Sequence, residues 1–104
     1  MEKRSPHYPL ARIRALIDAG AYRVTATAIR SAARDFGYLE VLQVAMSVRG
    51  LDSRSFYKSM TTLHDSTLWQ DVYRPVIEGQ PAYVKVQIVD DATVVISFKA
   101  LEDN

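Results

Sequence analysis

The hydrophobic residues of the chain change their period in its last third. Before Gly50 they recur every three or four residues, as in helices, whereas from Ala82 onward they alternate with polar residues, as in strands. This order predicts an α+β fold in which N-terminal helices pack on a C-terminal antiparallel β-sheet. A chain of 104 residues is normally one domain, so we expect a single domain over residues 1–104.

Helix signals divide the first half of the chain into three segments. We expect helices over about residues 9–19, 25–36 and 39–49, each followed by a glycine, which commonly ends a helix. Thr25 or Thr27 is expected to cap the second helix. Helical spacing predicts that the inward faces of the second and third helices consist of Ile29, Ala32, Ala33, Phe36, Leu42, Ala45 and Met46.

The middle of the chain carries shorter signals. Residues 22–24 and 69–76 have the composition of strands. Asp52 or Ser53 can cap one short helical turn that extends through Tyr57. We therefore expect the longer of these two strands to join the sheet beside the C-terminal strands.

Two alternating runs on either side of Asp90–Asp91 predict a β-hairpin. The apolar side chains expected to face the core are Ala82, Val84, Val86, Ile88, Val94, Ile96 and Phe98. All of them have even numbers, so the residues that face each other across the hairpin must have numbers of even sum. A slip of one position would turn every side chain of a strand to the opposite face.

This constraint predicts a register for the hairpin. A three-residue loop, or a five-residue loop, centred on Asp91 pairs Tyr83 with Lys99 and Lys85 with Ser97. All four side chains then lie on the polar face of the hairpin, opposite the core. A β-bulge would alter the pairing.

Positive charge is concentrated toward the N-terminus. Residues 1–34 contain seven Lys and Arg against two acidic residues, whereas the rest of the chain contains six against ten. A basic part beside an acidic part fits a protein that presents one face to a polyanion such as nucleic acid. Solvated helix faces would give the same distribution, so both interpretations stay open.

The residues that the chain lacks exclude several classes of protein and site. There is no cysteine for disulfides or thiolate metal sites, and no run of about 18 apolar residues for a membrane span. The first residues, MEKRSPHYP, have no apolar signal core, so we expect a cytoplasmic location. Asp90–Asp91 fits turn chemistry, and no His, Asp and Glu group has the spacing of metal ligands. We therefore expect neither a metal nor another cofactor.

The stretch FYKSMTTLHDSTLWQDVYRP, residues 56–75, mixes aromatic, hydroxyl, amide and charged side chains, unlike a plain core segment. It resembles the central block of the MqsR-type bacterial toxins. The start, MEKRSPHYPL, and the end, YVKVQIVDDATVVISFK, resemble the same family in the same order, so the resemblance covers nearly the whole chain. It implies a RelE-like fold and an endoribonuclease that acts as the toxin of a type II toxin–antitoxin system.

The resemblance also implies a catalytic site. Lys58 in YKSMTT, Gln70 in WQDVYRP and Tyr83 in AYVKV match catalytic residues of the family. Lys99 in SFK matches a lysine associated with the active site. The hairpin register independently puts Tyr83 and Lys99 on one face, whereas only the resemblance brings Lys58 and Gln70 beside them.

The roles follow from what RNA cleavage requires. The 2′-hydroxyl must lose a proton, the charge on phosphorus must be stabilised, and the leaving 5′-oxygen must gain a proton. We expect Tyr83 to transfer a proton and Lys58 to stabilise the phosphate with help from Lys99. Gln70 is expected to position the phosphate or a base. A contribution of His64 stays open, although a surface histidine is the commoner reading.

Three more residues are expected to contact RNA. Arg74 and Lys85 are candidates for phosphate contacts, and Tyr73 is a candidate for stacking on a base. The ordinary alternatives are surface cations and, for Tyr73, a place in the core or at its rim. Tyr83 could also be an exposed cross-strand residue that packs on its neighbours. Lys58 and Lys99 could be surface lysines, and Gln70 an ordinary polar residue of a strand.

The family resemblance finally implies partners. The substrate would be free mRNA, cut at short GC-containing sites by attack of the 2′-hydroxyl. A cognate antitoxin, with a zinc-binding domain and a DNA-binding domain, would neutralise the toxin. The main alternative is a non-catalytic module that binds RNA or protein without turnover, and the second is a degenerate toxin retained as a regulator.

Overall fold

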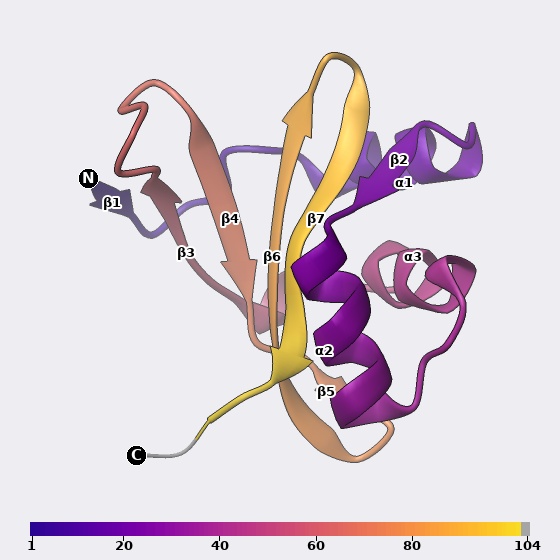
Figure 1. Cartoon of the computed structure of the whole chain (residues 1–104). Coiled ribbons are helices and arrows are strands. Elements are labelled where there is room, and N and C mark those ends of the chain that lie inside the picture. Colours follow the sequence, from indigo (N-terminus) through magenta and orange to yellow (C-terminus); the bar gives the residue numbers. More distant parts are fainter. Residues whose placement is uncertain (103–104) are drawn as a thin grey trace.

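The computed structural model describes residues 1–102, so the last two residues of the expected domain lie outside it. Three helices lie on one side of a seven-stranded sheet, and no helix of the described part covers the other side (Figure 1). The predicted α+β fold is therefore confirmed. The helices are α1 (Leu10–Asp18), α2 (Ala26–Phe36) and α3 (Val41–Arg49). None of them is long and apolar enough to cross a membrane.

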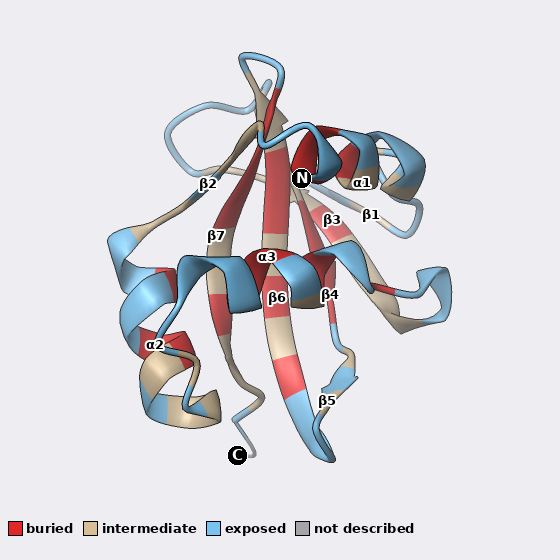
Figure 2. Ribbon diagram, turned by 90° about the vertical axis from the view of Figure 1, so that its right-hand side faces the viewer, coloured by how far each residue is buried: buried red, intermediate tan, exposed pale blue. Residues whose placement is uncertain are grey.

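The sheet is antiparallel except at one edge. Its strand order is β1-β3-β4-β6-β7-β2, with β5 paired to β6, and only β2 and β7 run parallel. The strands are β1 (Glu2–Lys3), β2 (Tyr22–Val24), β3 (Phe56–Thr61), β4 (Trp69–Tyr73), β5 (Val76–Ile77), β6 (Gln80–Val89) and β7 (Ala92–Ala100). Buried residues line the strands and the facing sides of the helices, so the core lies between the two layers (Figure 2).

Helix α2 begins after Thr25, one of the two expected caps. The Thr25 hydroxyl accepts a hydrogen bond from the backbone N–H of Ala28 at 3.1 Å, the usual N-cap contact. It also donates to the carbonyl oxygen of Ile96 in β7 at 2.9 Å. Gly37 ends the helix with a φ of 68°, a conformation that glycine adopts without a steric cost. The cap thus anchors α2 to the sheet.

The inward faces of α2 and α3 differ from the predicted ones. Ile29, Leu42 and Met46 are 41%, 57% and 45% exposed. Apolar residues lie on every side of α3, so the period alone does not select a face and packing on the sheet decides. In α2, the Ser31 hydroxyl donates to the Phe98 carbonyl at 2.7 Å, an approach that requires a small residue. Ala32 and Ala45 are buried as predicted, and the other buried residues of these faces are Ala28, Ser31, Val44 and Val48.

The hairpin of β6 and β7 has the predicted pairing only in the half distant from its turn, where Tyr83 faces Lys99. The predicted three- or five-residue loop is wrong. The loop has two residues, Asp90 and Asp91, with φ values of 53° and 54° that are typical of a type I′ turn. A bulge at Ile96 adds one residue to β7 and restores the predicted pairing beyond it.

The bulge also changes which side chains of β7 face the core. An extra residue reverses the alternation, so Val95 and Thr93 are fully buried toward the helices where Ile96 and Val94 were expected. Phe98, beyond the bulge, is buried in the core as predicted. The error has a local cause, because a bulge leaves no signal in the alternation of apolar residues.

Strand β3, like the two-residue strand β1 beside it, was not predicted from the sequence pattern. Asp52 caps a single 3₁₀ turn, Ser53–Ser55, and the chain becomes extended directly after it. The expected continuation of the turn through Tyr57 is therefore wrong. Pairing with β4 on one side and β1 on the other holds residues 56–61 extended, and β1 is distant in the sequence.

A buried carboxylate holds the N-terminal segment against the sheet. Asp71 of β4 is fully buried, and its oxygens accept hydrogen bonds from the backbone N–H groups of His7 at 3.0 Å and Tyr8 at 2.9 Å. The Tyr8 hydroxyl donates to the Trp69 carbonyl at 2.8 Å. These contacts keep β1, and with it Glu2, beside β3.

Asp71→Ala tests this anchor. It removes the acceptor of two backbone donors and should destabilise the fold by about 2–4 kcal/mol. Urea unfolding followed by circular dichroism measures the change. Asp18→Ala, which removes a surface carboxylate, serves as the control and should leave the unfolding midpoint nearly unchanged. An equal, small effect of both substitutions would contradict the anchoring role.

Candidate active site

The polar face of the sheet is built by alternation along four adjacent strands. Lys58 of β3 lies opposite Val72 of β4, which lies opposite Lys85 of β6, and Lys85 lies opposite Ser97 of β7. Val72 is fully buried although no helix lies on this side, so the longer side chains around it cover it. This row forms the centre of a surface that is open to solvent and rich in cations.

The four predicted catalytic residues all lie on this face. Tyr83 is directly opposite Lys99, and the Lys99 ammonium nitrogen is 5.3 Å from the centre of the Tyr83 ring. The charge of Lys58 acts on the Tyr83 phenol, so these two side chains are neighbours across β4. The Gln70 amide donates to the Gln87 side chain at 3.2 Å, one row further along the sheet.

The environment of Tyr83 keeps its phenol in the protonated form. Burial raises the pKa of the Tyr83 phenol above its ordinary value, and the positive charges of Lys58 and Arg74 offset part of this effect. The phenol is therefore protonated at neutral pH. A protonated phenol beside cations suits the donation of a proton to a developing oxyanion.

Lys58 is held as a fixed positive charge. Its ammonium nitrogen is 2.7 Å from a carboxylate oxygen of Glu2, which the N-terminal strand brings to the edge of β3. The hydrogen bond to Glu2 raises the pKa of Lys58. Lys58 thus remains protonated and can attract a phosphate, although an incoming phosphate must compete with Glu2.

Lys85 has the opposite environment. Burial lowers the pKa of its ammonium, and the positive charges of Lys99 and Lys58 lower it further. No carboxylate in residues 1–102 lies within ion-pair distance of Lys85. Two lysines on one face of the sheet therefore differ in how readily they lose a proton.

Tyr57 is a member of the site that the sequence analysis missed. Its ring is surrounded by cations: the guanidinium carbon of Arg74 lies 3.6 Å from the ring centre, that of Arg4 5.5 Å, and the Lys58 nitrogen 5.4 Å. The only signal in the sequence is its position next to Lys58. Arg74, one of the predicted RNA contacts, is exposed at this end of the site.

The placement of Tyr73 on the RNA-binding surface is wrong. Tyr73 is fully buried on the helix side of β4 and packs edge to face on Phe56 with ring centres 5.4 Å apart. It lies opposite Val84, a core residue, because alternation turns it away from Lys58 and Gln70. Its hydroxyl has no hydrogen-bond partner within the described part of the chain.

The two histidines lie away from the cation cluster. The His7 ring stacks on Trp69 at 5.5 Å and accepts a hydrogen bond from Lys3 at 2.9 Å, beside the anchor at Asp71. His64 is exposed in the loop between β3 and β4. Neither ring takes part in a hydrogen bond with a residue of the predicted catalytic set within residues 1–102.

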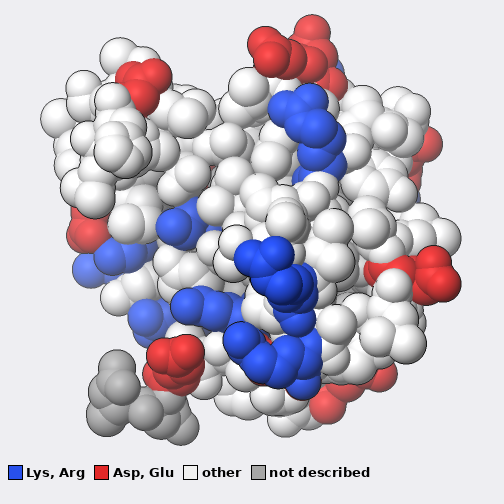
Figure 3. Space-filling model, viewed as in Figure 1, with Lys and Arg blue, Asp and Glu red and all other residues white. Residues whose placement is uncertain are grey.

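Positive charge extends beyond the sheet. Figure 3 shows a column of Lys and Arg side chains down the middle of this view and a second group to its left, near a hollow in the surface. Arg23 of β2 and Arg30 and Arg34 of α2 are exposed along the edge of the sheet next to β7. The cations of the sheet and of this edge together make a broad basic surface.

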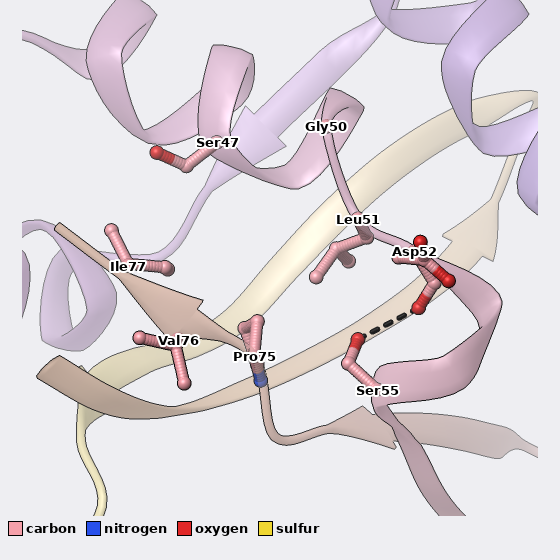
Figure 4. Close-up of a pocket in the computed structure, with 8 residues that line it drawn as sticks. All are labelled: Ser47, Gly50, Leu51, Asp52, Ser55, Pro75, Val76 and Ile77. Carbon is pink, nitrogen blue, oxygen red and sulfur yellow. Dashed lines mark hydrogen bonds between the residues drawn. The ribbon is translucent and has the colours of Figure 1, made fainter. Parts of the chain in front are cut away.

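A pocket elsewhere in the molecule lacks these features. It has a volume of about 320 Å³ and lies between the end of α3, the following loop and β5 (Figure 4). Its one ionisable side chain is Asp52, whose pKa Arg54 lowers to about 2. Leu51, Pro75 and Ile77 supply most of the remaining wall, so the pocket has no group for proton transfer near pH 7.

The described residues contain no group of three or more His, Cys, Asp or Glu side chains placed to hold a metal ion. The cluster of cations, a phenol and an amide on the sheet is the arrangement that can bind a phosphate. Comparison with known proteins agrees with this chemistry. Residues 5–100 match the family described as motility quorum-sensing regulator, toxin of MqsA.

The chain belongs to this MqsR toxin family. It is 40% identical over 99 residues to the mRNA interferase toxin MqsR of Escherichia coli strain K12. The alignment covers 95% of this chain and 98% of that protein. The resemblance that the motifs indicated is thus confirmed over nearly the full length of both MqsR proteins.

Tyr73→Phe tests the corrected position of Tyr73. Removing a buried hydroxyl without a partner should stabilise the fold by about 1 kcal/mol, measured as a higher urea midpoint. The interaction of the protein with RNA should not change, because the ring is on the helix side. Weaker RNA binding with unchanged stability would contradict the buried position of Tyr73 and support a place on the RNA-binding surface.

Proposed function

We propose that the chain is the toxin of a type II toxin–antitoxin system and cleaves mRNA as a metal-independent endoribonuclease. Its membership of the MqsR family supports the toxin function, and its E. coli relative is an mRNA interferase. The observation that carries the proposal is the gathering of Lys58, Gln70, Tyr83 and Lys99 on one open face of the sheet. Cleavage would fall at short GC-containing sites of free mRNA.

The proposed reaction is an attack of the RNA 2′-hydroxyl on the adjacent phosphate, which leaves a cyclic phosphate and a 5′-hydroxyl. Lys58 and Lys99 stabilise the negative charge that develops on the phosphate oxygens. Tyr83, whose phenol is protonated at neutral pH, donates its proton to the leaving 5′-oxygen. Gln70 positions the phosphate or a neighbouring base. Arg74 and Lys85 widen the positive surface for adjacent phosphates.

A cytoplasmic toxin of this kind would be neutralised by a cognate antitoxin. The family description names MqsA as the partner of its toxins. We propose that the antitoxin has a zinc-binding part that contacts the toxin and a DNA-binding part. The edge strands β1 and β2 can each accept an added strand from such a partner.

A non-catalytic module that binds RNA or protein is the alternative. Purified protein incubated with a defined RNA in the presence of EDTA separates the two. Cleavage that survives EDTA and is lost in Lys58→Ala supports the enzyme. Binding of the RNA without any cleavage supports the module.

Tyr83→Phe tests the proton donor. It keeps the ring over Lys99 but removes the proton, so cleavage should slow by roughly 10²- to 10⁴-fold. Single-turnover rates on a labelled RNA measure the effect. Tyr38→Phe removes a phenol that packs near Phe98 on the helix side and should cleave at the wild-type rate. Near-normal cleavage by Tyr83→Phe would remove Tyr83 from the mechanism.

Glu2→Gln tests the competition for Lys58. Loss of the carboxylate frees the ammonium for a phosphate, so we expect about two- to fivefold tighter binding of a 2′-deoxy RNA analogue. Fluorescence anisotropy at low and high salt measures the affinity, and the gain should shrink at high salt. Glu78→Gln removes the same charge from an exposed turn. Equal affinity of the two variants would contradict the competition.

A further inference from the structure

Lys85 lies at the centre of the polar face. On its own strand, Tyr83 and Gln87 flank it on the same face, and across the sheet it lies between Val72 and Ser97. Neighbouring strands lie about 4.8 Å apart, so a phosphate seated over Val72 and reached by Lys58 is also within reach of Lys85. A phosphate held over Val72 would therefore lie next to Lys85.

We propose that an RNA phosphate binds over Val72 and that Lys85 is the general base, which takes the proton from the attacking 2′-hydroxyl. The inference rests on the proposed endoribonuclease function and goes beyond a phosphate contact for this residue. The reaction also needs a group that accepts the proton of the 2′-hydroxyl. Tyr83 is protonated and donates, so another group must accept the first proton.

The other candidates for the base are less suitable. Lys58 is tied to Glu2 at 2.7 Å, and this contact favours its charged form. Lys99 lies over the Tyr83 ring and interacts with Asp35, whose pKa it helps to lower. Glu2 itself has a lowered pKa because of Lys58, which makes its carboxylate a weak base.

The surroundings of Lys85 favour its neutral form. The charged groups that face it are Lys58 from β3 and Lys99 from β7, both positive, and both lower the pKa of Lys85 in addition to burial. The uncharged polar groups around it are Tyr83, Gln87 and Ser97. Two groups whose pKa values are shifted in opposite directions by their environments are typical of an acid and base pair.

The step balances in protons and bonds. Neutral Lys85 accepts the 2′-hydroxyl proton while the 2′-oxygen forms a bond to phosphorus. The bond from phosphorus to the 5′-oxygen breaks, and Tyr83 gives its proton to that oxygen. The products are a 2′,3′-cyclic phosphate and a 5′-hydroxyl. The proton on Lys85 then returns to the Tyr83 phenolate directly or through water, which restores both groups.

The test compares Lys85→Arg with Lys85→Met across pH. If Lys85 only attracts phosphate, Lys85→Arg keeps the charge and the rate. If it is the base, both variants lose roughly 10²- to 10⁴-fold in kcat/KM. The wild-type kcat/KM should rise with pH and level off below the ordinary lysine value of 10.5, and this rise should be absent in Lys85→Met. Lys3→Met is the control and should keep the wild-type profile.

A second substrate separates the base from the acid. An RNA with sulfur in place of the leaving 5′-oxygen needs no proton donor. It should restore cleavage by Tyr83→Phe but not by Lys85→Arg or Lys85→Met. Affinity for a 2′-deoxy analogue should stay near the wild-type value in Lys85→Arg, which shows that the surface is intact.

The outcomes are distinguishable. Wild-type protein that cleaves neither RNA at any pH would overturn the proposed function and this inference together. Wild-type cleavage with a near-normal rate and pH profile for Lys85→Arg would overturn the base and leave the function standing. Rescue of Lys85→Met by the sulfur substrate would also overturn it, because the lost step would then be protonation of the leaving group.

Discussion

The pairing of β6 with β7, including the bulge at Ile96, is the constraint on which the rest of the molecule depends. Before the bulge it turns Val95 into the core, and beyond it Phe98 into the core and Lys99 to the open face. The carbonyl of Ile96 accepts the hydrogen bond of the Thr25 cap, so the bulge also positions α2. One extra residue thus lets β7 place apolar side chains on the helix-covered face and a cation on the open face.

Contacts with distant parts of the chain decide which lysine of the open face has an acidic partner. Glu2 reaches Lys58 because Asp71 holds the backbone of His7 and so keeps the N-terminal strand beside β3. Lys85, between two other lysines, has no such partner in residues 1–102. Glu2 therefore keeps Lys58 a fixed cation, whereas burial and the positive charges of Lys99 and Lys58 lower the pKa of Lys85.

Much of this site was predictable from the sequence, and the exceptions have physical causes. Alternation together with an expected loop centred on Asp91 paired Tyr83 with Lys99. The loop is shorter than expected, and the bulge at Ile96 restores that pairing. Lys58 and Gln70 needed the family resemblance, since β3 pairs with β4, and β4 with β6, only in the folded chain. Tyr73 was misplaced because an aromatic residue in a strand fits either face equally well.

The sequence by itself determined that three helices precede the C-terminal hairpin, that Thr25 or Thr27 caps α2, and that the chain resembles the MqsR family, since these depend on residues close together in the chain or on motifs. Tertiary structure alone decided the inward faces of α2 and α3, the strand at 56–61 and the ion pair of Glu2. Each of these depends on contacts between residues distant in sequence, and the free energy of such contacts is not contained in local periodicity.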